Sequence, residues 1–585
     1  MRTRGLLVSI AMGAGLSLTV GLTACGTTSS SSSGTSGEPE PEPQVHGVDL
    51  VLVVDNSISM ADKQTLLAPS IARLLSDLTN PPCFDASGAP AATQPASGDE
   101  ACAAGTSRKM DPVRSLHLGV ISSSLGALGG TQCDAIAGGD PSTNDRAHLL
   151  SRGPDGSVVP TYQSLGYLAW DADGAMSPPG ESDFDALVQN ATDMVVGVGE
   201  VGCGYEMPLE AAARFLADPA PYDHLETSGG TTSPVGVDET LLAQREAFLR
   251  PDSLVAVVLL SDENDCSIDV AKQPSVLLGT APMFRARQEC ATDPNDACCT
   301  SCALETPAGC PADPTCESSP MLEQSEDPIN LRCYDQKRRF GFDFKYPTER
   351  YVRAFSDAVV DPSSPTFEAT AGSGAPNPLF ADGGRLAKHV LFTSIVGVPW
   401  QDLASDPTNA SSPLKSTSQM ESDGSWTHLL GANGGAPTDP FMRESTSPRA
   451  GTNPFTGEDV AATNSINGGD RTLEAGFGDL EYVCTFGLEA PVDGGECGAC
   501  IDASCDNPIC DGETQIGAKA YPGVRQLEIV RALGDRGIAA SICSPGAAST
   551  DPSSPPPVAG ATAYVASMQS LETRIATELA EPAGE

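Results

Sequence analysis

The fold of this chain is decided by the stretch Val48-Asp49-Leu50-Val51-Leu52-Val53-Val54-Asp55-Asn56-Ser57-Ile58-Ser59-Met60. A run so rich in valine and leucine predicts a strand that is buried on both faces, as in a parallel sheet. Asp55, Ser57 and Ser59 follow it, in the loop that leaves the carboxyl end of the strand. Open α/β sheets bind their ligands at that end of the strands. The stretch therefore predicts both an α/β fold and a candidate site.

The Asp-x-Ser-x-Ser pattern places one carboxylate and two hydroxyls on a tight loop. These are hard oxygen ligands of the kind that suits Mg²⁺, Mn²⁺ or Ca²⁺. A simpler interpretation is that Ser59, which precedes Asp62-Lys63-Gln64, serves as the N-cap of a helix. The two interpretations are compatible, and both stay open at this point.

Apolar strand-like runs alternate with amphipathic helical segments along the whole chain, which predicts an α/β fold with a doubly wound, mostly parallel sheet. We expect strands at 48–54, 113–123, 253–260, 389–398 and 538–543, and helices at 62–78, 184–196, 208–217, 348–359, 521–533 and 564–579. These strands and helices predict one domain over residues 46–582, with insertions at about 83–112, 126–182, 266–346 and 400–515. A break into two domains near residue 400 is the alternative.

The N-terminus reads as a targeting segment. Arg2 and Arg4 precede an apolar core, and the core ends in Leu22-Thr23-Ala24-Cys25-Gly26, which resembles the lipobox of bacterial lipoproteins. That resemblance implies a signal peptide over residues 1–24 and a lipidated Cys25, and Gly26 after the cysteine favours the outer membrane, with the protein facing the periplasm or the surface. Residues 25–45 would then form a tether of a serine run and a stiff Glu-Pro repeat. An ordinary signal peptide is the alternative.

The net charge of the chain limits the classes of molecule that it is expected to bind. The 585 residues carry a formal net charge of −44, which argues against nucleic acid and anionic lipid as partners. Contact with a membrane is therefore expected through the lipid anchor only. Glycine and proline number 59 and 48, so long connections of low helix propensity are expected.

The 19 cysteines indicate disulfides, because the chain is expected to be exported. With Cys25 assigned to the anchor, an even number remains, and we expect Cys83 and Cys102 to pair across a loop. One cluster at 290–333 and another at 484–510 each hold an odd number, so at least one bridge should leave each cluster. Cys299-x-x-Cys302 and Cys497-x-x-Cys500 also have spacings found in zinc sites, although neither cluster contains a histidine.

The first loop is similar to the metal-ion-dependent adhesion site of the von Willebrand factor A family. That family has Asp-x-Ser-x-Ser in its first loop, matched here by Asp55, Ser57 and Ser59. Its third loop carries an aspartate just after a buried strand, and Asp262 follows Leu254–Leu260 in this way. The resemblance implies the family's fold and a divalent cation, Mg²⁺, Mn²⁺ or Ca²⁺, bound where the loops meet.

The second loop departs from the family pattern. The family usually has a threonine there, just before a helix, and that position falls near Gly204 in this chain. Glu206 is the nearest oxygen donor, directly or through water. Alternatively, Glu206 is only a favourable anion at a helix N-terminus. This departure leaves the identity and affinity of the metal open, not the fold.

If the second and third loops meet at a metal, Cys203 and Cys266, which flank them, would lie close enough to form a disulfide. This hypothesis rests on the resemblance, and such a bridge would preorganise the site. The resemblance also implies a protein partner that offers a carboxylate to the metal.

These features predict a lipid-anchored surface protein that binds a divalent cation for adhesion or for protein–protein interaction. Two alternatives remain. A metal-free structural envelope lipoprotein would keep the fold without the ligand function. An exported hydrolase is a weaker alternative, because the chain contains no nucleophile elbow, zincin motif or Walker loop, and its six histidines do not cluster in sequence. We therefore expect no enzyme and no catalytic residues.

Overall fold

The computed structural model describes residues 44–131, 133, 143–229, 231–381, 383–432, 434–473, 478–497, 507–543, 545 and 563–580. The signal segment 1–24, the lipidated Cys25 and nearly all of the tether lie outside the described residues, as do Cys500 and Cys505. Predictions about those residues stay predictions.

Six strands form a mostly parallel central sheet in the order β15-β11-β8-β1-β4-β5. Only the edge pair β4–β5 is antiparallel. The strands are β1 (Gly47–Val54), β4 (Ser115–Ser122), β5 (Tyr167–Asp171), β8 (Ser253–Leu260), β11 (Val390–Val396) and β15 (Gly537–Ser541). Because β15 joins the same sheet as β8 and β11, the sheet draws strands from both sides of residue 400.

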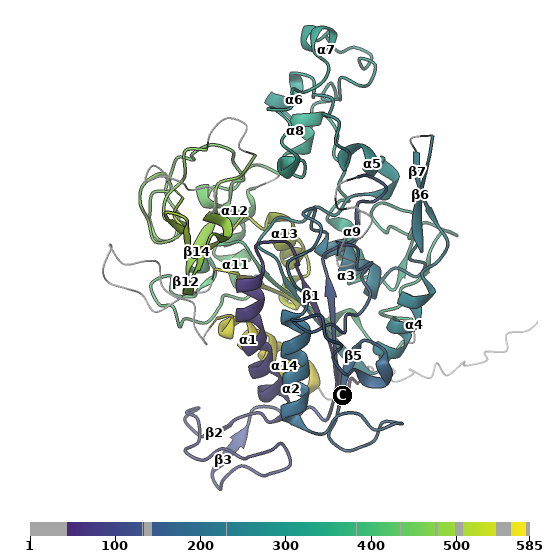
Figure 1. Cartoon of the computed structure of the whole chain (residues 1–585). Helices are drawn as coiled ribbons and strands as arrows, with labels where there is room; N and C mark the ends of the chain where they lie inside the picture. Colours follow the sequence, from purple (N-terminus) through teal and green to yellow (C-terminus); the bar gives the residue numbers. More distant parts are fainter. Residues whose placement is uncertain are drawn as a thin grey trace, which may run out of the picture. The chain divides into compact units, whose positions relative to one another are not determined.

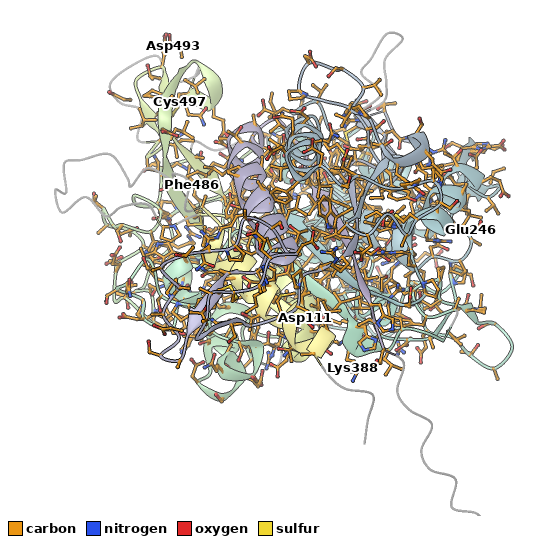
Figure 2. The ribbon with its side chains drawn as sticks, turned by 90° about the horizontal axis from the view of Figure 1, so that it is seen from below. Asp111, Glu246, Lys388, Phe486, Asp493 and Cys497 are labelled. Carbon is orange, nitrogen blue, oxygen red and sulfur yellow. A yellow bond between two sulfur atoms is a disulfide. The ribbon has the colours of Figure 1, made fainter. Side chains whose placement is uncertain are left out.

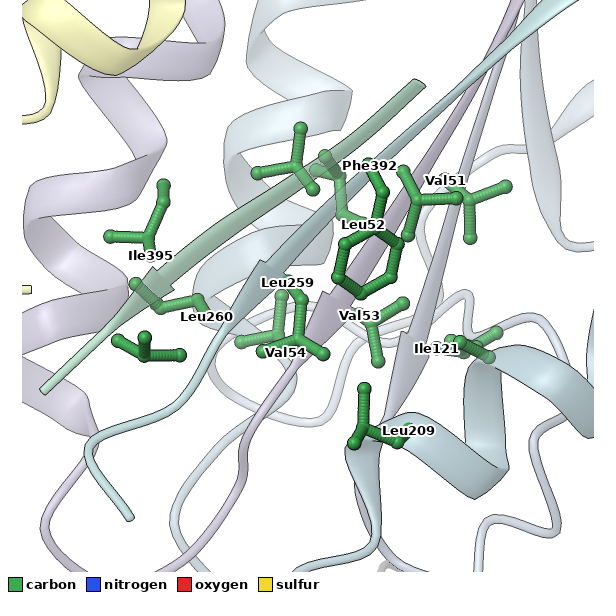
Figure 3. Close-up of a cluster of buried hydrophobic side chains, with 14 of the residues drawn as sticks. Val51, Leu52, Val53, Val54, Ile121, Leu209, Leu259, Leu260, Phe392 and Ile395 are labelled. Carbon is green, nitrogen blue, oxygen red and sulfur yellow. The ribbon is translucent and has the colours of Figure 1, made fainter. Parts of the chain in front are cut away.

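The centre of the sheet is apolar on both faces. Every residue of β1 and of β8 is buried, and the two strands pair in register from Gly47 opposite Ser253 to Val54 opposite Leu260. Valine and leucine side chains from these strands meet Phe392 and Ile395 of β11 in Figure 3. Burial on both faces is what an apolar run of this kind predicts for a central parallel strand, and the prediction is confirmed.

The longer helices fall into two groups (Figure 1). In one, α1 packs against α2 and α14; in the other, α9 packs against α3 and α13. Their bounds are α1 (Ala61–Thr79), α2 (Phe184–Val196), α3 (Pro208–Leu216), α9 (Glu349–Ala354), α13 (Val524–Ala532) and α14 (Val565–Ala580), and α4 (Glu239–Phe248) packs against α3. The helices expected from the sequence are present, although α9 is shorter than its apolar pattern suggested.

Along the sequence, the remaining elements lie in the segments that connect the strands of the central sheet. Three hairpins are formed by β2 (Cys83–Asp85) and β3 (Thr106–Arg108), β6 (His224–Ser228) and β7 (Thr231–Val235), and β9 (Val359–Val360) and β10 (Ala375–Pro376). A small sheet is formed by β12 (Cys484–Asp493), β13 (Cys510–Asp511) and β14 (Thr514–Ala520). The short helices are α5 (Pro274–Leu277), α6 (Glu289–Thr292), α7 (Pro314–Ser318), α8 (Gln336–Phe340), α10 (Trp400–Leu403), α11 (Thr417–Ser422) and α12 (Ser425–Leu430).

Two parts of the chain differ from the expectation. The stretch 126–182, predicted as an insertion, contains the edge strand β5 of the central sheet, which has only five residues. The polar segment from Asp402 to Asp479, within the insertion predicted at about 400–515, contains α11 and α12 and buries Trp426 and Phe441 completely or almost so. Widely spaced apolar residues in a polar segment give no regular period, so the sequence alone did not indicate this packing.

Eight disulfides are present among the described residues. They join 83–102, 133–203, 266–333, 290–299, 298–310, 302–316, 484–543 and 497–510. The expected pair Cys83–Cys102 is confirmed, and each cysteine cluster sends one bridge outwards. The zinc interpretation of Cys299-x-x-Cys302 is wrong, because both sulfurs are in disulfides, and Cys497 of the second motif is bonded to Cys510.

Within the ranges that the structure describes, no helix is both long enough and apolar enough to cross a membrane.

Candidate functional site

The carboxyl ends of β1 and β8 bring the first and third loops together. Asp55 directly follows β1, and Asp262 lies just beyond β8. The hydroxyl of Ser261 donates a 2.6 Å hydrogen bond to Asp55 Oδ2, and the hydroxyl of Ser59 donates a 2.8 Å bond to Asp262 Oδ2. Each loop thus contributes a serine to the other loop's carboxylate, and the two loops form one site.

The first loop is held in shape by its own aspartate. Asp55 Oδ1 accepts a 2.9 Å hydrogen bond from the backbone N–H of Ser57, which is the bond of an Asx turn. The N-cap of α1 is Met60, with no side-chain capping bond. The interpretation of Ser59 as the N-cap is therefore wrong, because its hydroxyl is used by Asp262 instead.

Asp55 is fully buried at the centre of this site. Burial, followed by the neighbouring charge of Asp262, raises the pKa of its carboxyl to about 6, against the opposing effect of the Ser261 hydrogen bond. A carboxylate that is withdrawn from water beside another carboxylate favours the approach of a cation.

Two lysines reach Asp262, and the sequence did not reveal either of them. Burial alone would raise the pKa of Asp262, but the ammonium groups of Lys519 and Lys63 together hold it below its usual value. Both Nζ atoms lie 3.2 Å from Asp262 Oδ2. Lys63 Nζ also donates a 2.6 Å bond to the backbone oxygen of Ser59. Lys63 could have been predicted to lie near the site, because it follows Ser59 of the motif by only four residues. Lys519 could not, because it is far from the motif in sequence.

The second loop brings Glu206 to the same place. Its backbone oxygen accepts a 2.8 Å hydrogen bond from the N–H of Cys266, so the second and third loops are in contact. Burial, followed by the charges of Glu263 and Asp55, raises the pKa of Glu206 well above its usual value. Glu206 also lies directly before Met207, the N-cap of α3, so its alternative role as a favourable anion at a helix N-terminus stays a prediction beside the ligand role.

Glu263 and Ser123 are further members of the site; the sequence suggested Glu263 as an additional charge in the third loop, whereas Ser123 was not singled out. Burial raises the pKa of Glu263 to about 7, against the opposing charge of Lys519. Ser123, just after β4, places its hydroxyl 3.3 Å from Asp55 Oδ1. The signal was a run of three serines, Ser122-Ser123-Ser124, at the end of the second expected strand. A hydroxyl is therefore present near the site although the family's threonine is missing.

Two oxygens of the site are buried without a hydrogen-bond partner, namely Ser57 Oγ and Asp262 Oδ1. Buried polar atoms normally have a partner, so such atoms call for an explanation. Both are hard oxygen donors and fit a divalent cation. Among the described residues, no three carboxylate, imidazole or thiolate side chains are grouped as a metal site, so a cation here would need the serine hydroxyls and water as well.

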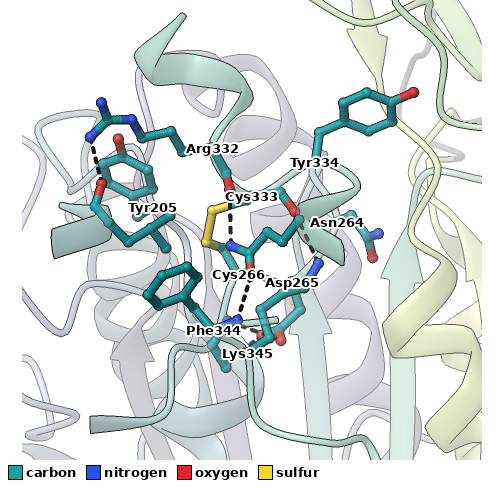
Figure 4. The surroundings of a disulfide bond; sticks show 12 residues. Tyr205, Asn264, Asp265, Cys266, Arg332, Cys333, Tyr334, Phe344 and Lys345 are labelled. Carbon is teal, nitrogen blue, oxygen red and sulfur yellow. Dashed lines mark hydrogen bonds between the residues drawn. A yellow bond between two sulfur atoms is a disulfide. The ribbon is translucent and has the colours of Figure 1, made fainter. Parts of the chain in front are cut away.

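The disulfide hypothesis for Cys203 and Cys266 is wrong. Cys203 is bonded to Cys133, and Cys266 is bonded to Cys333 (Figure 4). Each loop is thus tied to its own neighbouring insertion instead of to the other loop. Lys345 lies beside the second bridge and donates a 2.9 Å hydrogen bond to the backbone oxygen of Cys333. Because the chain holds many cysteines, the closeness of two loops was not enough to identify which cysteines form disulfides with each other.

Comparison of the chain with protein-family models, with curated proteins and with solved structures found no match.

Proposed function

We propose that this protein is a metal-dependent binding domain of the von Willebrand factor A type, which lipid at Cys25 anchors to the outer membrane, for adhesion or protein–protein interaction. The observation that carries the proposal is the pair of buried, unpartnered oxygens, Ser57 Oγ and Asp262 Oδ1, in two loops that hydrogen-bond to each other. The lipobox-like sequence around Cys25 supports the anchor.

The topology of the sheet supports this assignment. Numbered along the chain, the six sheet strands lie in the order 3-2-1-4-5-6, with β1 and β8 as strands 1 and 4. In doubly wound folds of this order, ligands bind where the strand order reverses, at the carboxyl ends of strands 1 and 4. Asp55 and Asp262 follow these two strands. The two groups of helices and the complete burial of β1 agree with a sheet that is covered on both faces.

The residues have distinct roles in this proposal. Asp55 and Asp262 would supply carboxylate oxygens, while Ser57 and Ser59 would supply hydroxyls. Glu206 would complete the set directly or through water. A bound divalent cation keeps one coordination position open for the carboxylate of a partner protein. The protein's part is to hold these oxygens in place and to exclude water from Asp55, which is fully buried.

Charge balance supports a divalent ion. Four carboxyl groups, those of Asp55, Glu206, Asp262 and Glu263, face two ammonium groups, those of Lys63 and Lys519. Lys63 is also paired with Asp62, 3.1 Å away, so negative charge exceeds positive charge when all of these groups are ionised, and a bound cation would reduce the excess. A buried site with an uncompensated charge is costly, so this balance favours occupancy.

Apolar side chains at the rim support a protein partner. Ile58, between the two serines of the motif, is 83% exposed, and Val201, in the second loop, is 53% exposed. The two loops are joined where the N–H of Gly202 donates a 2.6 Å bond to the backbone oxygen of Asn56. Exposed aliphatic residues next to a buried charged centre are typical of a docking surface, where they exclude water around a central contact.

One observation favours the second candidate, a metal-free envelope protein. Lys63 and Lys519 already place positive charge on Asp262 Oδ2, where a cation would otherwise be needed. In that case the site would serve only to hold the loops together.

Thermal unfolding of the purified protein with Mg²⁺, Mn²⁺, Ca²⁺ or chelator separates the two candidates. A cation that binds only the folded state, at about 100 times its dissociation constant, adds about 2.7 kcal/mol of stability. We expect a rise in the midpoint with at least one metal, its loss in Asp55→Ala, and its retention in Asp111→Ala, which removes an exposed aspartate away from the site. No shift with any metal would refute the metal-dependent function and leave the metal-free candidate.

A further inference from the structure

We propose that Lys519, carried by the second cysteine-rich insertion, sets the cation affinity of the site by competing with the metal for the charge of Asp262. This inference rests on the proposed metal-binding function. It identifies a determinant of affinity that lies outside the three loops which form the site.

Lys519 reaches the site from a small structural unit, the sheet of β12, β14 and β13. It lies on β14, which pairs with β12 along an antiparallel ladder. In Figure 2, Phe486 marks the base of this hairpin and Asp493 its far end. Two disulfides, Cys484–Cys543 and Cys497–Cys510, tie the unit to β15 and to itself. Lys519 is therefore carried by a strand of a disulfide-bonded sheet and not by a flexible loop.

The ammonium group makes two contacts, and two hydrogen bonds of Tyr521 hold the ring beside it in place. Lys519 Nζ donates a 3.2 Å hydrogen bond to Asp262 Oδ2 and lies 4.5 Å from the centre of the Tyr521 ring. The N–H of Tyr521 donates a 2.8 Å bond to the backbone oxygen of Asp262, so the two segments are joined by their main chains as well. The hydroxyl of Tyr521 donates to Asp479, which fixes the ring under the ammonium group.

The two oxygens of Asp262 are therefore used differently. Oδ2 is occupied by Ser59 and the two lysines, whereas Oδ1 is buried and has no partner. A cation on Oδ1 would share one carboxylate with Lys519, and like charges so close in a site of low dielectric constant repel strongly. Lys519 thus keeps the loops together without metal and at the same time weakens the binding of metal. Such a site would bind and release its cation reversibly instead of holding it permanently.

Isothermal titration of the purified protein with Mg²⁺, Mn²⁺ and Ca²⁺ tests this inference in Lys519→Met and Lys519→Arg. We expect Lys519→Met to bind the preferred cation at least tenfold more tightly, a change of about 1.4 kcal/mol. Lys519→Arg keeps the charge and should stay within about threefold of the wild type. The matched control is Lys415→Met, which removes a lysine of the same insertion that lies 3.3 Å from Asp423, outside the site.

A purely structural role for Lys519 predicts a different result. Lys519→Met would then lower the unfolding midpoint in chelator without changing the cation affinity, and this outcome would overturn the inference while leaving the metal function intact. Tighter binding in Lys519→Met with no binding in the wild type would support the inference and refute the metal function of the native protein. No binding in any folded variant would refute both. Should Lys519→Met not fold, Lys519→Gln, which retains hydrogen-bond donors without the charge, is subject to the same criteria.

Discussion

The buried carboxylates at the two ends of the central sheet differ in how completely their surroundings are hydrogen-bonded. At the amino end, Asp49 accepts hydrogen bonds from the backbone N–H and the Nε of Arg250, at 2.9 and 2.8 Å, and from the hydroxyl of Ser253. Arg385 adds a second guanidinium 3.7 Å away. No buried side-chain atom of these residues lacks a partner.

The carboxyl end of the same strands is less completely satisfied. Ser57 Oγ and Asp262 Oδ1 have no hydrogen-bond partner, and burial beside Asp262 raises the pKa of Asp55 to about 6. Buried polar atoms without a partner also occur elsewhere among the described residues, as at Asp402 Oδ2 and Glu481 Oε1, but Ser57 Oγ and Asp262 Oδ1 lie in two loops that hydrogen-bond to each other. The comparison therefore indicates that the amino end is built for stability, whereas the carboxyl end leaves oxygens available for the proposed cation.

The largest expected difference between the two ends concerns their aspartates. Asp49→Ala should lower the free energy of unfolding by about 3–5 kcal/mol, because it leaves the partly buried guanidinium of Arg250 and the buried one of Arg385 without their carboxylate. Asp55→Ala in chelator should cost less, about 1–3 kcal/mol, because the loss of the hydrogen bonds from Ser57 and Ser261 is partly offset by the removal of repulsion with Asp262. Urea unfolding of both variants measures these values. Equal losses at the two ends would contradict the comparison.

The amino end should also give the protein a specific sensitivity to acid. Burial, followed by the positive charge of Arg250, lowers the pKa of His117 to about 4, against the opposing charge of Asp49. The native imidazole is neutral, while the unfolded chain binds a proton below about pH 6.5. The stabilisation is thus fully present above pH 6.5 and is lost as the pH falls to about 4, by up to about 3 kcal/mol.

This acid sensitivity is measured as the free energy of unfolding between pH 7 and 4 for the wild type and His117→Gln. Glutamine can still donate to the backbone oxygen of Phe248, which lies 2.7 Å from His117 Nδ1. The variant should lose less stability than the wild type over this window. Parallel curves for the two proteins would show that His117 does not titrate as described.

The sequence predicted those parts of the fold and site that depend on local pattern. The apolar runs that became β1 and β8 could be recognised because both faces of a central parallel strand are buried. Asp55, Ser59 and Asp262 could be placed together because they follow such strands. Asp262 was singled out by the resemblance to the von Willebrand factor A family, and the rule that the carboxyl ends of parallel strands share one edge of the sheet agrees with its placement beside Asp55.

Long-range partners could not be predicted in this way. Lys519 contacts Asp262 across 257 residues, and nothing in the pattern of β14 distinguishes this lysine from one that faces solvent. The same holds for disulfides: Cys203 and Cys266 do lie on loops that touch, yet each is bonded to a cysteine of a different insertion. Contacts of this kind are decided by tertiary packing, which a single sequence does not encode as a period.

The smallest expected effect gives the sharpest test, because it compares the same substitution at both ends. Ser253→Ala should cost about 1–3 kcal/mol, since Asp49 and Arg385 both lose a buried partner. Ser57→Ala in chelator should change the free energy of unfolding by less than about 0.5 kcal/mol, because its hydroxyl oxygen has no partner to lose. With the preferred cation present, Ser57→Ala should become the costly variant and Ser253→Ala should not change. A Ser57→Ala variant that is neutral under both conditions would mean that the unpaired hydroxyl serves no cation.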